Sequence, residues 1–397
     1  MAMIDAWVAP TAKGKLVRQQ VELGPLGAEE VEVQVKHCGL CHSDLSVRND
    51  DWGFSRFPAV LGHEAVGRVV EVGPAAKGLR VGQHVGIGWT ASSCMHCRQC
   101  RSGDQHLCPT ATPTIVGHLG AFASRVRSHW TWAIPLPEQI DVAEAGPLLC
   151  GGITVFNPLA MYARPTSRVG VVGIGGLGHM AVKLAAAYGC DVTAFTSSES
   201  KFDEARLFGA HRVVSSRSSS AIKQLAGTFD LVLVTVNVPL DWDALIASLA
   251  PNGRIHVVGA VLEPIPVSVP SLIAGQRSLS GSPTGSPVAI ETMLDFAARH
   301  NITPQTEHLP MSRINEAFER LVAGKARFRI VLDADFWSAI HPTRSSSWPR
   351  LRSGRLAARP RSRCCGGVLL LLFLAGMVRP LRSGRAPYPL TLAGVAT

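Results

Sequence analysis

The chain has 397 residues and a formal net charge of +10, but that charge is confined to one end. Residues 336–397 carry ten of the 39 basic residues, all of them Arg, and no acidic residue, which leaves 29 residues of each sign in 1–335. This neutral body disfavours a nucleic-acid-binding fold, which would carry a basic patch on the folded domain. Its length predicts about two domains, and the 46% hydrophobic content excludes a disordered chain.

The first 147 residues are rich in Gly and Val and alternate in polarity over short segments such as Val31–Val35. Frequent turn residues separate these segments, so the pattern predicts antiparallel β structure. No apolar signal segment opens the chain. The longest uncharged apolar run, Val368–Val378, has eleven residues, whereas a bilayer span needs about 20. We therefore expect a cytoplasmic protein with no membrane partner.

Strands and helices alternate after residue 148, which predicts a parallel, doubly wound sheet. Strands are expected at Arg168–Gly173, Asp191–Phe195, Arg212–Val214, Leu231–Val236 and Arg254–Val258, the last one after a turn at Pro251–Gly253. Helices are expected up to Tyr188, at Phe202–Phe208, at 288–300 and at 313–323, before a closing strand at Phe328–Leu332. The Arg-rich tail, 336–397, repeats Leu-Arg-Ser-Gly-Arg at 351–355 and 381–385. Its composition predicts a disordered or non-native segment.

A glycine-rich loop follows the first of these strands and opens a helix. Gly173-Ile174-Gly175-Gly176-Leu177-Gly178 matches G-x-G-x-x-G in the context that the motif requires. The glycines permit a tight turn and the close approach of a pyrophosphate, whose charge the helix N-terminus stabilises. An ordinary strand-to-helix turn is the alternative. We predict a dinucleotide site that also includes Thr235 and Gly259, at the ends of later strands.

The residues after the second strand bear on the choice between NAD and NADP. An acidic residue there would bind the ribose 2′-hydroxyl of NAD and repel the 2′-phosphate of NADP. The chain instead has Thr196, Ser197, Ser198 and Lys201, which can donate hydrogen bonds or supply positive charge to a phosphate. This favours NADP, although a serine here also serves as a helix cap and Glu199 can face the ribose.

Two sets of residues suggest metal sites. Cys94, Cys97, Cys100 and Cys108 form C-x2-C-x2-C-x7-C, and four thiolates within fifteen residues suit a closed, structural zinc site. Disulfides are disfavoured in a cytoplasmic protein. The second set, Cys41, His63, Glu64 and Cys150, is dispersed, and its spacing alone does not define a site. A catalytic zinc needs three protein ligands and an open position, and two cysteines with one histidine are a known form.

Five motifs occur in a fixed order. They are Cys38–Leu45, Gly62–Gly67, the four-cysteine segment, Leu148–Thr154 and the Gly173–Gly178 loop. In this order they resemble the zinc-dependent medium-chain alcohol dehydrogenases, and in particular the cinnamyl alcohol dehydrogenases and bacterial NADPH-dependent aldehyde reductases. The resemblance covers roughly residues 5–335. It implies a GroES-like catalytic domain at 1–148 completed by 287–335, a Rossmann-type NADP-binding domain at 149–286, and a homodimer.

The resemblance also implies roles for individual residues. Cys41, His63 and Cys150 would bind the catalytic zinc, and Glu64 would approach it. Asp44 would orient His63, Ser43 would hydrogen-bond the reacting alcohol, His42 would lie near the cofactor phosphates, and Thr154 would line the nicotinamide. The zinc would polarise the aldehyde oxygen while the nicotinamide carries the hydride. The implied ligands are two zinc ions, NADP(H) and a small aldehyde or alcohol, without nucleic acid.

The chain departs from the family at one relay position, where Ser46 replaces a common histidine, and its segment between Cys108 and Gly117 is short. Trp52, Phe54 and Trp89 either border the substrate channel or pack within loops. Three alternatives remain: an NAD-preferring enzyme, a zinc- and nucleotide-binding protein without catalysis, and a phosphate or lipid binder that acts through the basic tail.

Overall fold

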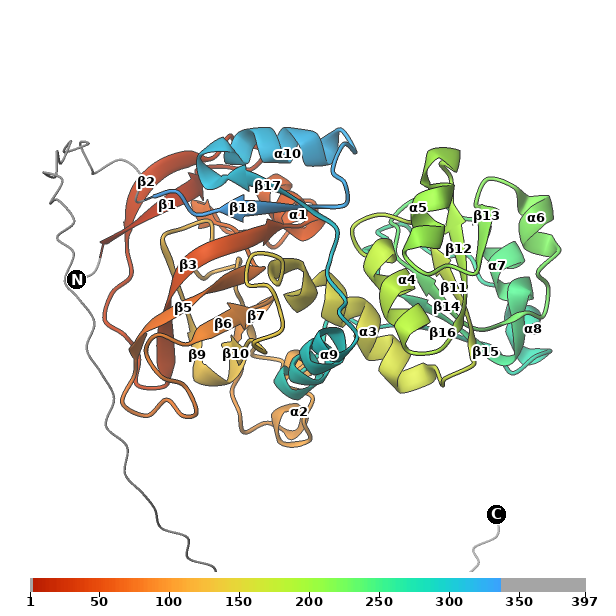
Figure 1. Cartoon of the computed structure of the whole chain (residues 1–397), viewed down its shortest axis with the longest axis horizontal. Helices are drawn as coiled ribbons and strands as arrows, with labels where there is room; N and C mark the ends of the chain where they lie inside the picture. Colours follow the sequence, from red (N-terminus) through yellow and green to blue (C-terminus); the bar gives the residue numbers. More distant parts are fainter. Residues whose placement is uncertain (1–2, 337–397) are drawn as a thin grey trace, which may run out of the picture. The chain divides into compact units, whose positions relative to one another are not determined.

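The computed structural model describes residues 3–336, so the prediction made for the tail falls almost wholly outside the described residues. The N-terminal half forms mainly antiparallel sheets, as its polarity pattern predicts (Figure 1). Its strands are β1 (Met3–Ala9), β2 (Val17–Glu22), β3 (Glu30–Leu40), β4 (Ala59–Val60), β5 (Ala65–Val72), β6 (His84–Ile87), β7 (Thr90–Ser92), β8 (Thr112–Pro113), β9 (Arg125–His129) and β10 (Ile134–Pro135). Two short helices interrupt them, α1 (His42–Asn49) and α2 (Arg98–Arg101), with 3-10 turns η1 (Gln105–Leu107), η2 (Trp130–Trp132) and η3 (Gly146–Leu149).

The end of the described chain returns to this β region. Strands β17 (Thr306–Pro310) and β18 (Arg329–Asp333) extend the largest sheet, whose order is β10-β6-β5-β3-β18-β17, with β9 also paired to β3. Helix α10 (Ile314–Val322), preceded by η5 (Met311–Arg313), connects the two strands. Its buried residues Ile314, Ala317, Phe318 and Leu321 follow the spacing of one helix face. This return places residues near 329 beside the end of β3.

A six-stranded parallel sheet occupies the middle of the chain. It consists of β11 (Arg168–Val172), β12 (Asp191–Thr196), β13 (Arg212–Ser215), β14 (Phe229–Val234), β15 (Leu249–Val257) and β16 (Ser278–Gly281). Its helices are α3 (Gly151–Tyr162), α4 (Gly178–Ala187), α5 (Phe202–Leu207), α6 (Ser219–Lys223), α7 (Trp242–Ser248), α8 (Val269–Ile273) and α9 (Pro287–Arg299), with η4 (Glu199–Lys201). The strand order β13-β12-β11-β14-β15-β16 is that of a Rossmann sheet. The predicted fold class is confirmed.

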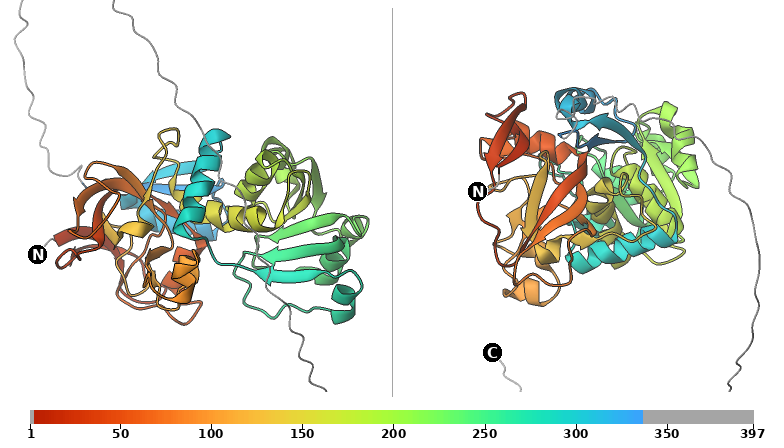
Figure 2. Two further views of the ribbon diagram at one scale, coloured as in Figure 1. Left: turned by 90° about the horizontal axis from the view of Figure 1, so that it is seen from below. Right: turned by 60° about the vertical axis from the view of Figure 1, so that its left-hand side comes forward.

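Alternating side chains explain why helices cover both faces of this sheet (Figure 2). Val169 and Val171 on β11 belong to the core cluster that includes α4, whereas Val172 belongs to the cluster that includes α6 and α7. Strand residues point alternately to opposite faces, so a continuous apolar run supplies two cores. The buried valines therefore fix β11 in the centre of the sheet, with its carboxyl end at the glycine-rich loop.

One predicted boundary is wrong. We expected Pro251–Gly253 to form a turn before a strand, but β15 runs through these residues from Leu249 to Val257. The register between β14 and β15 shifts at this point. Leu249 pairs with Phe229 and Arg254 with Leu231, so β15 contains extra residues between these two pairs. Asn252 takes a left-handed backbone conformation, with φ of 64°, and its N–H donates to the carbonyl of Gly275. Within residues 3–336, no helix is long and apolar enough to cross a bilayer.

Candidate active site

The end of β3 and the start of α1 position the first candidate ligand. Cys41 is the N-cap of α1, and Asp44 Oδ2 accepts a hydrogen bond from the Cys41 amide at 3.0 Å. The other carboxylate oxygen, Oδ1, accepts from the Gly62 amide at 2.9 Å and lies 3.0 Å from His63 Nδ1. Asp44 is completely buried, and these contacts occupy both of its oxygens. A carboxylate on Nδ1 fixes the orientation of the ring and directs Nε2 away from Asp44.

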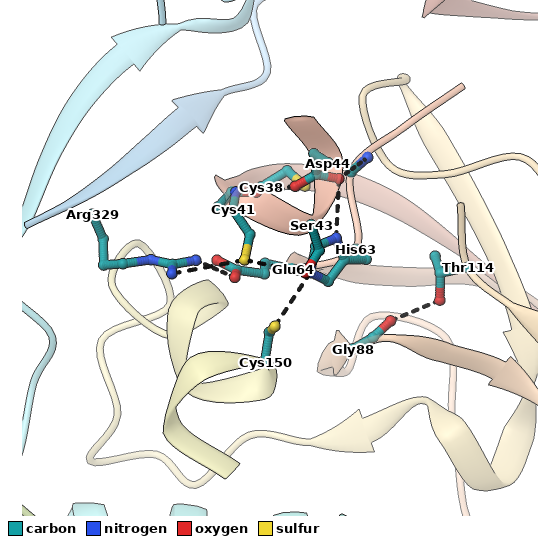
Figure 3. A network of polar contacts seen from close by, with 12 residues as sticks. Cys38, Cys41, Ser43, Asp44, His63, Glu64, Gly88, Thr114, Cys150 and Arg329 are labelled. Carbon is teal, nitrogen blue, oxygen red and sulfur yellow. Dashed lines mark hydrogen bonds and ion pairs between the residues drawn. The ribbon is translucent and has the colours of Figure 1, made fainter. Parts of the chain in front are cut away.

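Four dispersed side chains meet at this place. Cys41, His63, Glu64 and Cys150 are buried, and their ligand atoms lie within 4.8 Å of one another. His63 Nε2 is 3.2 Å from the sulfur of Cys150, which lies between η3 and α3. Figure 3 shows the four side chains converging, with Asp44 above His63 and connected to it by a dashed line. The fold therefore brings together residues that are separated by up to 109 positions in the sequence.

The two cysteines of this cluster have different electrostatic environments. A hydrogen bond with Cys150 lowers the pKa of Cys41 well below its usual value, and the charges of Arg329 and His63 add to this effect against the opposing effect of burial. The same hydrogen bond, together with burial, raises the pKa of Cys150. Of these two cysteines, Cys41 therefore loses its proton first and carries the negative charge. Ser43 Oγ lies 3.8 Å from the Cys41 sulfur.

Arg329 is a functional residue that our sequence reasoning missed. It opens β18, is nearly fully buried, and forms an ion pair with Glu64. Its Nη1 lies 3.9 Å from the sulfur of Cys41. A signal for it was present in the sequence, where Arg329 opens an otherwise apolar strand. Arginine is almost never fully buried without a partner, so an arginine at such a position indicates a buried acidic partner. Burial raises the pKa of Glu64 to about 7, although the positive charge of Arg329 opposes this rise.

The room around Glu64 depends on a glycine. A Cβ atom at position 39 would lie 2.0 Å from Oε2 of Glu64, so the Cys38-Gly39 sequence leaves space for the carboxylate. Among the described residues, Oε2 of Glu64 is buried without a hydrogen-bond partner. An unpartnered buried carboxylate oxygen is costly. A cation beside it would offset that cost, so the buried cluster fits a zinc ion with two sulfur ligands, one nitrogen ligand and a nearby carboxylate.

The second cysteine set forms a local cluster around α2 and η1. The sulfurs of Cys94, Cys97, Cys100 and Cys108 also lie within 4.8 Å of one another, and all four are free thiols. The Cys94 sulfur is 4.0 Å from that of Cys100 and 3.6 Å from that of Cys108. Thiolates about 2.3 Å from a tetrahedral zinc ion are separated by about 3.8 Å. The cluster therefore fits zinc, and four protein ligands leave no open position for a substrate.

The glycine-rich loop has the geometry of a phosphate-binding turn. Gly173 has φ of +92°, and a Cβ there would meet Val236 at 2.1 Å. A Cβ at Gly178 would lie 1.7 Å from the Gly173 carbonyl oxygen, so this glycine allows α4 to begin directly against the strand. A Cβ at Gly175, in contrast, would meet nothing within 4 Å. Gly173 thus permits the turn, Gly178 permits the helix to pack against the strand, and Gly175 leaves the backbone open to a ligand.

Two of the other cofactor candidates, Lys201 and Thr235, contact the glycine-rich loop directly. The Lys201 ammonium donates to the Ile174 carbonyl at 2.9 Å, and the Thr235 hydroxyl donates to the Gly173 carbonyl at 2.9 Å. A Cβ at Gly176 would lie 3.0 Å from Cδ of Arg329, so this arginine also reaches the loop from the buried cluster. The remaining candidates lie at the end of β12 (Thr196, Ser197 and Ser198), at the end of β15 (Gly259), in α3 (Thr154) and in α1 (His42 and Ser43), with Ile174 and Leu177 in the loop itself.

Aromatic side chains border the buried cluster. The Trp89 ring packs edge-on against His63, with ring centroids 5.2 Å apart. Trp52 lies 6.1 Å from Trp89 and 5.5 Å from Phe54. About half of the Phe54 side chain is exposed. The three rings therefore form a row of aromatic contacts from the imidazole of His63 to the surface, and Trp52 and Trp89 also pack against the hydrophobic core of the β region.

Comparisons with known proteins agree with this geometry. Residues 27–138 match the alcohol dehydrogenase GroES-like domain, and residues 176–299 match the zinc-binding dehydrogenase domain. An aldehyde reductase of Synechocystis sp. is 50% identical over 83% of this chain and 98% of its own length.

Two solved structures have the same fold. A cinnamyl alcohol dehydrogenase of Sorghum bicolor superposes with a TM-score of 0.81 at 35% identity, over 84% of this chain and 98% of its own. The cinnamyl alcohol dehydrogenase of Helicobacter pylori, complexed with NADP(H), superposes with a TM-score of 0.78 at 28% identity over the same shares. From the ordered motifs, the two cysteine-containing clusters and these similarities, the chain belongs to the zinc-dependent medium-chain alcohol dehydrogenases.

Proposed function

We propose that this protein is an NADP(H)-dependent zinc oxidoreductase that reduces aldehydes to primary alcohols and catalyses the reverse oxidation. The observation that carries the proposal is the convergence of Cys41, His63 and Cys150 beside a glycine-rich loop to which Arg329 connects them. The relatives that share the fold are named for aldehyde reduction or cinnamyl alcohol oxidation, and one of them is complexed with NADP(H).

The buried cluster supplies the chemistry in this proposal. Cys41, His63 and Cys150 hold the catalytic zinc, with Glu64 beside it, and the zinc when bound supplies Lewis-acid polarisation of the substrate oxygen. Asp44 keeps Nε2 of His63 directed at the site through its contact with Nδ1. The Ser43 hydroxyl, near the Cys41 sulfur, donates a hydrogen bond to the substrate oxygen and begins the path of its proton.

The neighbouring residues bind the cofactor and balance charge. The loop Gly173–Gly178 presents backbone N–H groups to the pyrophosphate, and Thr154 and His42 lie on the nicotinamide and phosphate sides. Arg329 forms an ion pair with Glu64, and its side chain also packs against Gly176 in the glycine-rich loop. It thereby positions the Glu64 carboxylate relative to the cofactor. Ser197, Ser198 and Lys201 bind the 2′-phosphate, which gives the preference for NADP. Cys94, Cys97, Cys100 and Cys108 hold a structural zinc.

The domain division and the assembly are part of the same proposal. We assign 1–148 with 287–335 to the catalytic domain and 149–286 to the nucleotide domain, because β17 and β18 pair within the sheet of β3. We also propose a homodimer formed through the nucleotide domains. Strand β16 lies at the edge of its sheet, and the nearby apolar side chains of Leu262 and Ile273 are 67% and 73% exposed.

The direct test is NADPH oxidation with a series of aromatic and aliphatic aldehydes, before and after treatment with a zinc chelator. We expect turnover that is lost with zinc and restored by its addition. Activity that persists after exhaustive removal of zinc would refute the mechanism.

The cofactor preference needs its own test, in which initial rates with NADPH and NADH are compared at equal concentration. We expect the wild type to favour NADPH. Lys201→Ala should lower the NADPH-to-NADH rate ratio about tenfold, because it removes one charge-assisted hydrogen bond to the 2′-phosphate. The control Lys77→Ala removes an exposed lysine from the catalytic domain and should leave the ratio unchanged. A wild type that favours NADH contradicts the proposed role of Ser197, Ser198 and Lys201.

A further inference from the structure

A third group of histidine and aspartate side chains with potential ligand atoms lies outside both cysteine clusters. His37 on β3, His308 on β17 and Asp333 on β18 offer ligand atoms within 4.8 Å of one another. The three strands are adjacent in the order β3-β18-β17 (Figure 1). His37 is the direct register partner of Asp333, and His308 lies two residues before Pro310, the register partner of Asp333 on β17. Residues two apart on a strand share a face, so the sheet itself presents the three side chains together.

The two imidazoles converge on a single oxygen. Nδ1 of His37 is 2.7 Å and Nδ1 of His308 is 2.9 Å from Oδ1 of Asp333. The two rings are nearly perpendicular, with an interplanar angle of 82°. Two ring nitrogens and one carboxylate oxygen that point to a common place are a donor set for zinc, cobalt, nickel or copper. Ligand atoms about 2.0–2.1 Å from one tetrahedral ion lie about 3.3 Å apart, so each nitrogen and the oxygen would separate by about half an ångström to admit the ion.

A second carboxylate holds one of these rings in place. Oε1 of Glu144, in the segment before η3, lies 3.3 Å from Nε2 of His308, and the Thr306 hydroxyl donates to the other Glu144 oxygen. Metal-binding histidines commonly donate the N–H of the second ring nitrogen to a carboxylate, which directs the first nitrogen to the ion. The two carboxylates, Asp333 and Glu144, supply negative charge that would offset the charge of a divalent cation.

The accessibility of the group also suits an ion that binds from solution. The side chains of His37, His308 and Glu144 are about a quarter exposed, and that of Asp333 is 41% exposed. An ion can therefore enter without opening the core. The cysteine clusters use sulfur ligands, whereas this group uses only nitrogen and oxygen, which predicts weaker and reversible binding.

We propose that His37, His308 and Asp333 form a third metal site, for a divalent transition-metal ion, with Glu144 as the residue that positions His308. The site connects three strands of the catalytic domain to the segment that leads into Cys150. Because none of its residues belongs to the buried cluster, the proposal does not depend on the proposed catalytic function.

The test is a titration of the zinc-loaded protein with Co²⁺, followed by calorimetry and visible absorption. We expect one additional ion per chain, with weak d–d bands and without the thiolate-to-metal absorption that exchange into a cysteine cluster would produce. His37→Gln and His308→Gln should each abolish this binding, and Glu144→Gln should weaken it by about tenfold.

A matched control comes from His211, which is exposed and lies 3.8 Å from Asp191 without a second imidazole. His211→Gln should bind the additional ion as the wild type does. Melting temperatures of all variants, measured without added cobalt, show whether each variant is folded. The proposal is overturned if the wild type binds no additional ion, or if folded His37→Gln and His308→Gln bind it as His211→Gln does.

Discussion

The two cysteine-containing clusters use similar ligands in opposite ways. Cys94, Cys97, Cys100 and Cys108 come from fifteen consecutive residues around a short helix, and their four thiols would complete the coordination of a metal. The buried cluster draws Cys41, His63 and Cys150 from three distant segments, and a carboxylate and an arginine adjoin it. The first arrangement suits a structural role, because it is local and closed. The second offers three strong ligands, so a zinc ion bound there would keep an open position for a substrate.

The surroundings of the clusters differ as much as their ligands do. Asp44 and Arg329 connect the buried cluster to α1, to the segment before β5 and to the glycine-rich loop. The hydrogen bonds of the four-cysteine sulfurs stay within their own segment, with backbone amides, with one another and with Thr110. A change in the buried cluster should therefore alter catalysis, and a change in the four-cysteine cluster should alter stability. The following predictions test that separation, from the largest effect to the smallest.

Removal of a buried ligand should have the largest effect. We expect Cys150→Ser to lower kcat/KM by at least about 10³-fold, because Lewis-acid stabilisation contributes several kcal/mol to the barrier. The zinc content should fall by about one ion per chain, while the circular dichroism spectrum is retained. Steady-state kinetics and elemental analysis measure both quantities. A variant that has lost this zinc but keeps a tenth of the activity would show that the buried cluster is not the catalytic centre.

Removal of a ligand from the other cluster should chiefly destabilise the protein. We expect Cys100→Ser to lower the free energy of unfolding by about 4 kcal/mol, which is in the range of changes that remove a metal. The kcat per folded molecule should change less than threefold. Chemical denaturation and active-site titration separate the two effects. A large loss of kcat in folded protein would mean that the clusters are coupled.

Removal of Arg329 should leave a buried carboxylate without its partner. We expect Arg329→Met to cost about 3–5 kcal/mol of stability. The double variant with Glu64→Gln should recover part of this loss, because it also removes the uncompensated charge. A thermodynamic cycle of the two single variants and the double variant measures the coupling. If the two losses simply add, the ion pair has no energetic role.

Removal of the Asp44 carboxylate charge should have the smallest effect of the four. Asp44→Asn keeps the shape of the side chain but weakens its hold on His63. We expect zinc affinity in the buried cluster and kcat/KM each to fall about 10–100-fold. The control Asp203→Asn changes an exposed aspartate on α5 and should alter neither. Competition with a chromogenic chelator gives the affinity, and equal affinities for Asp44→Asn and wild type would remove Asp44 from the mechanism.

The features predictable from sequence are those with a local signal. The glycine-rich loop lies between a buried strand and a helix, and the four cysteines have a spacing that points to one ion. Strand and helix positions follow from polarity patterns, with errors of a few residues at the boundaries. At Pro251–Gly253 the turn residues predicted an interruption of the strand. The strand continues instead, because β15 pairs with β14 both before and after these residues.

The features that were missed depend on long-range pairing. Arg329 reaches Glu64 only because β18 pairs antiparallel with β3, which places a residue almost 290 positions further along the sequence beside the Cys38–Cys41 segment. The group of His37, His308 and Asp333 likewise exists only in the assembled sheet. No spacing in the sequence reveals either contact. The buried cluster was identified from the order of its motifs, not from the separation of its ligands.

The most direct test of the separation follows aldehyde-dependent NADPH oxidation and zinc content together during stepwise chelation. We expect activity to fall in proportion to the zinc lost from the buried cluster, and one added equivalent of zinc to restore it while the four-cysteine cluster stays filled. Full activity in protein that has lost the zinc of the buried cluster, shown by alkylation of Cys41 and Cys150 in samples taken in parallel, would contradict the account.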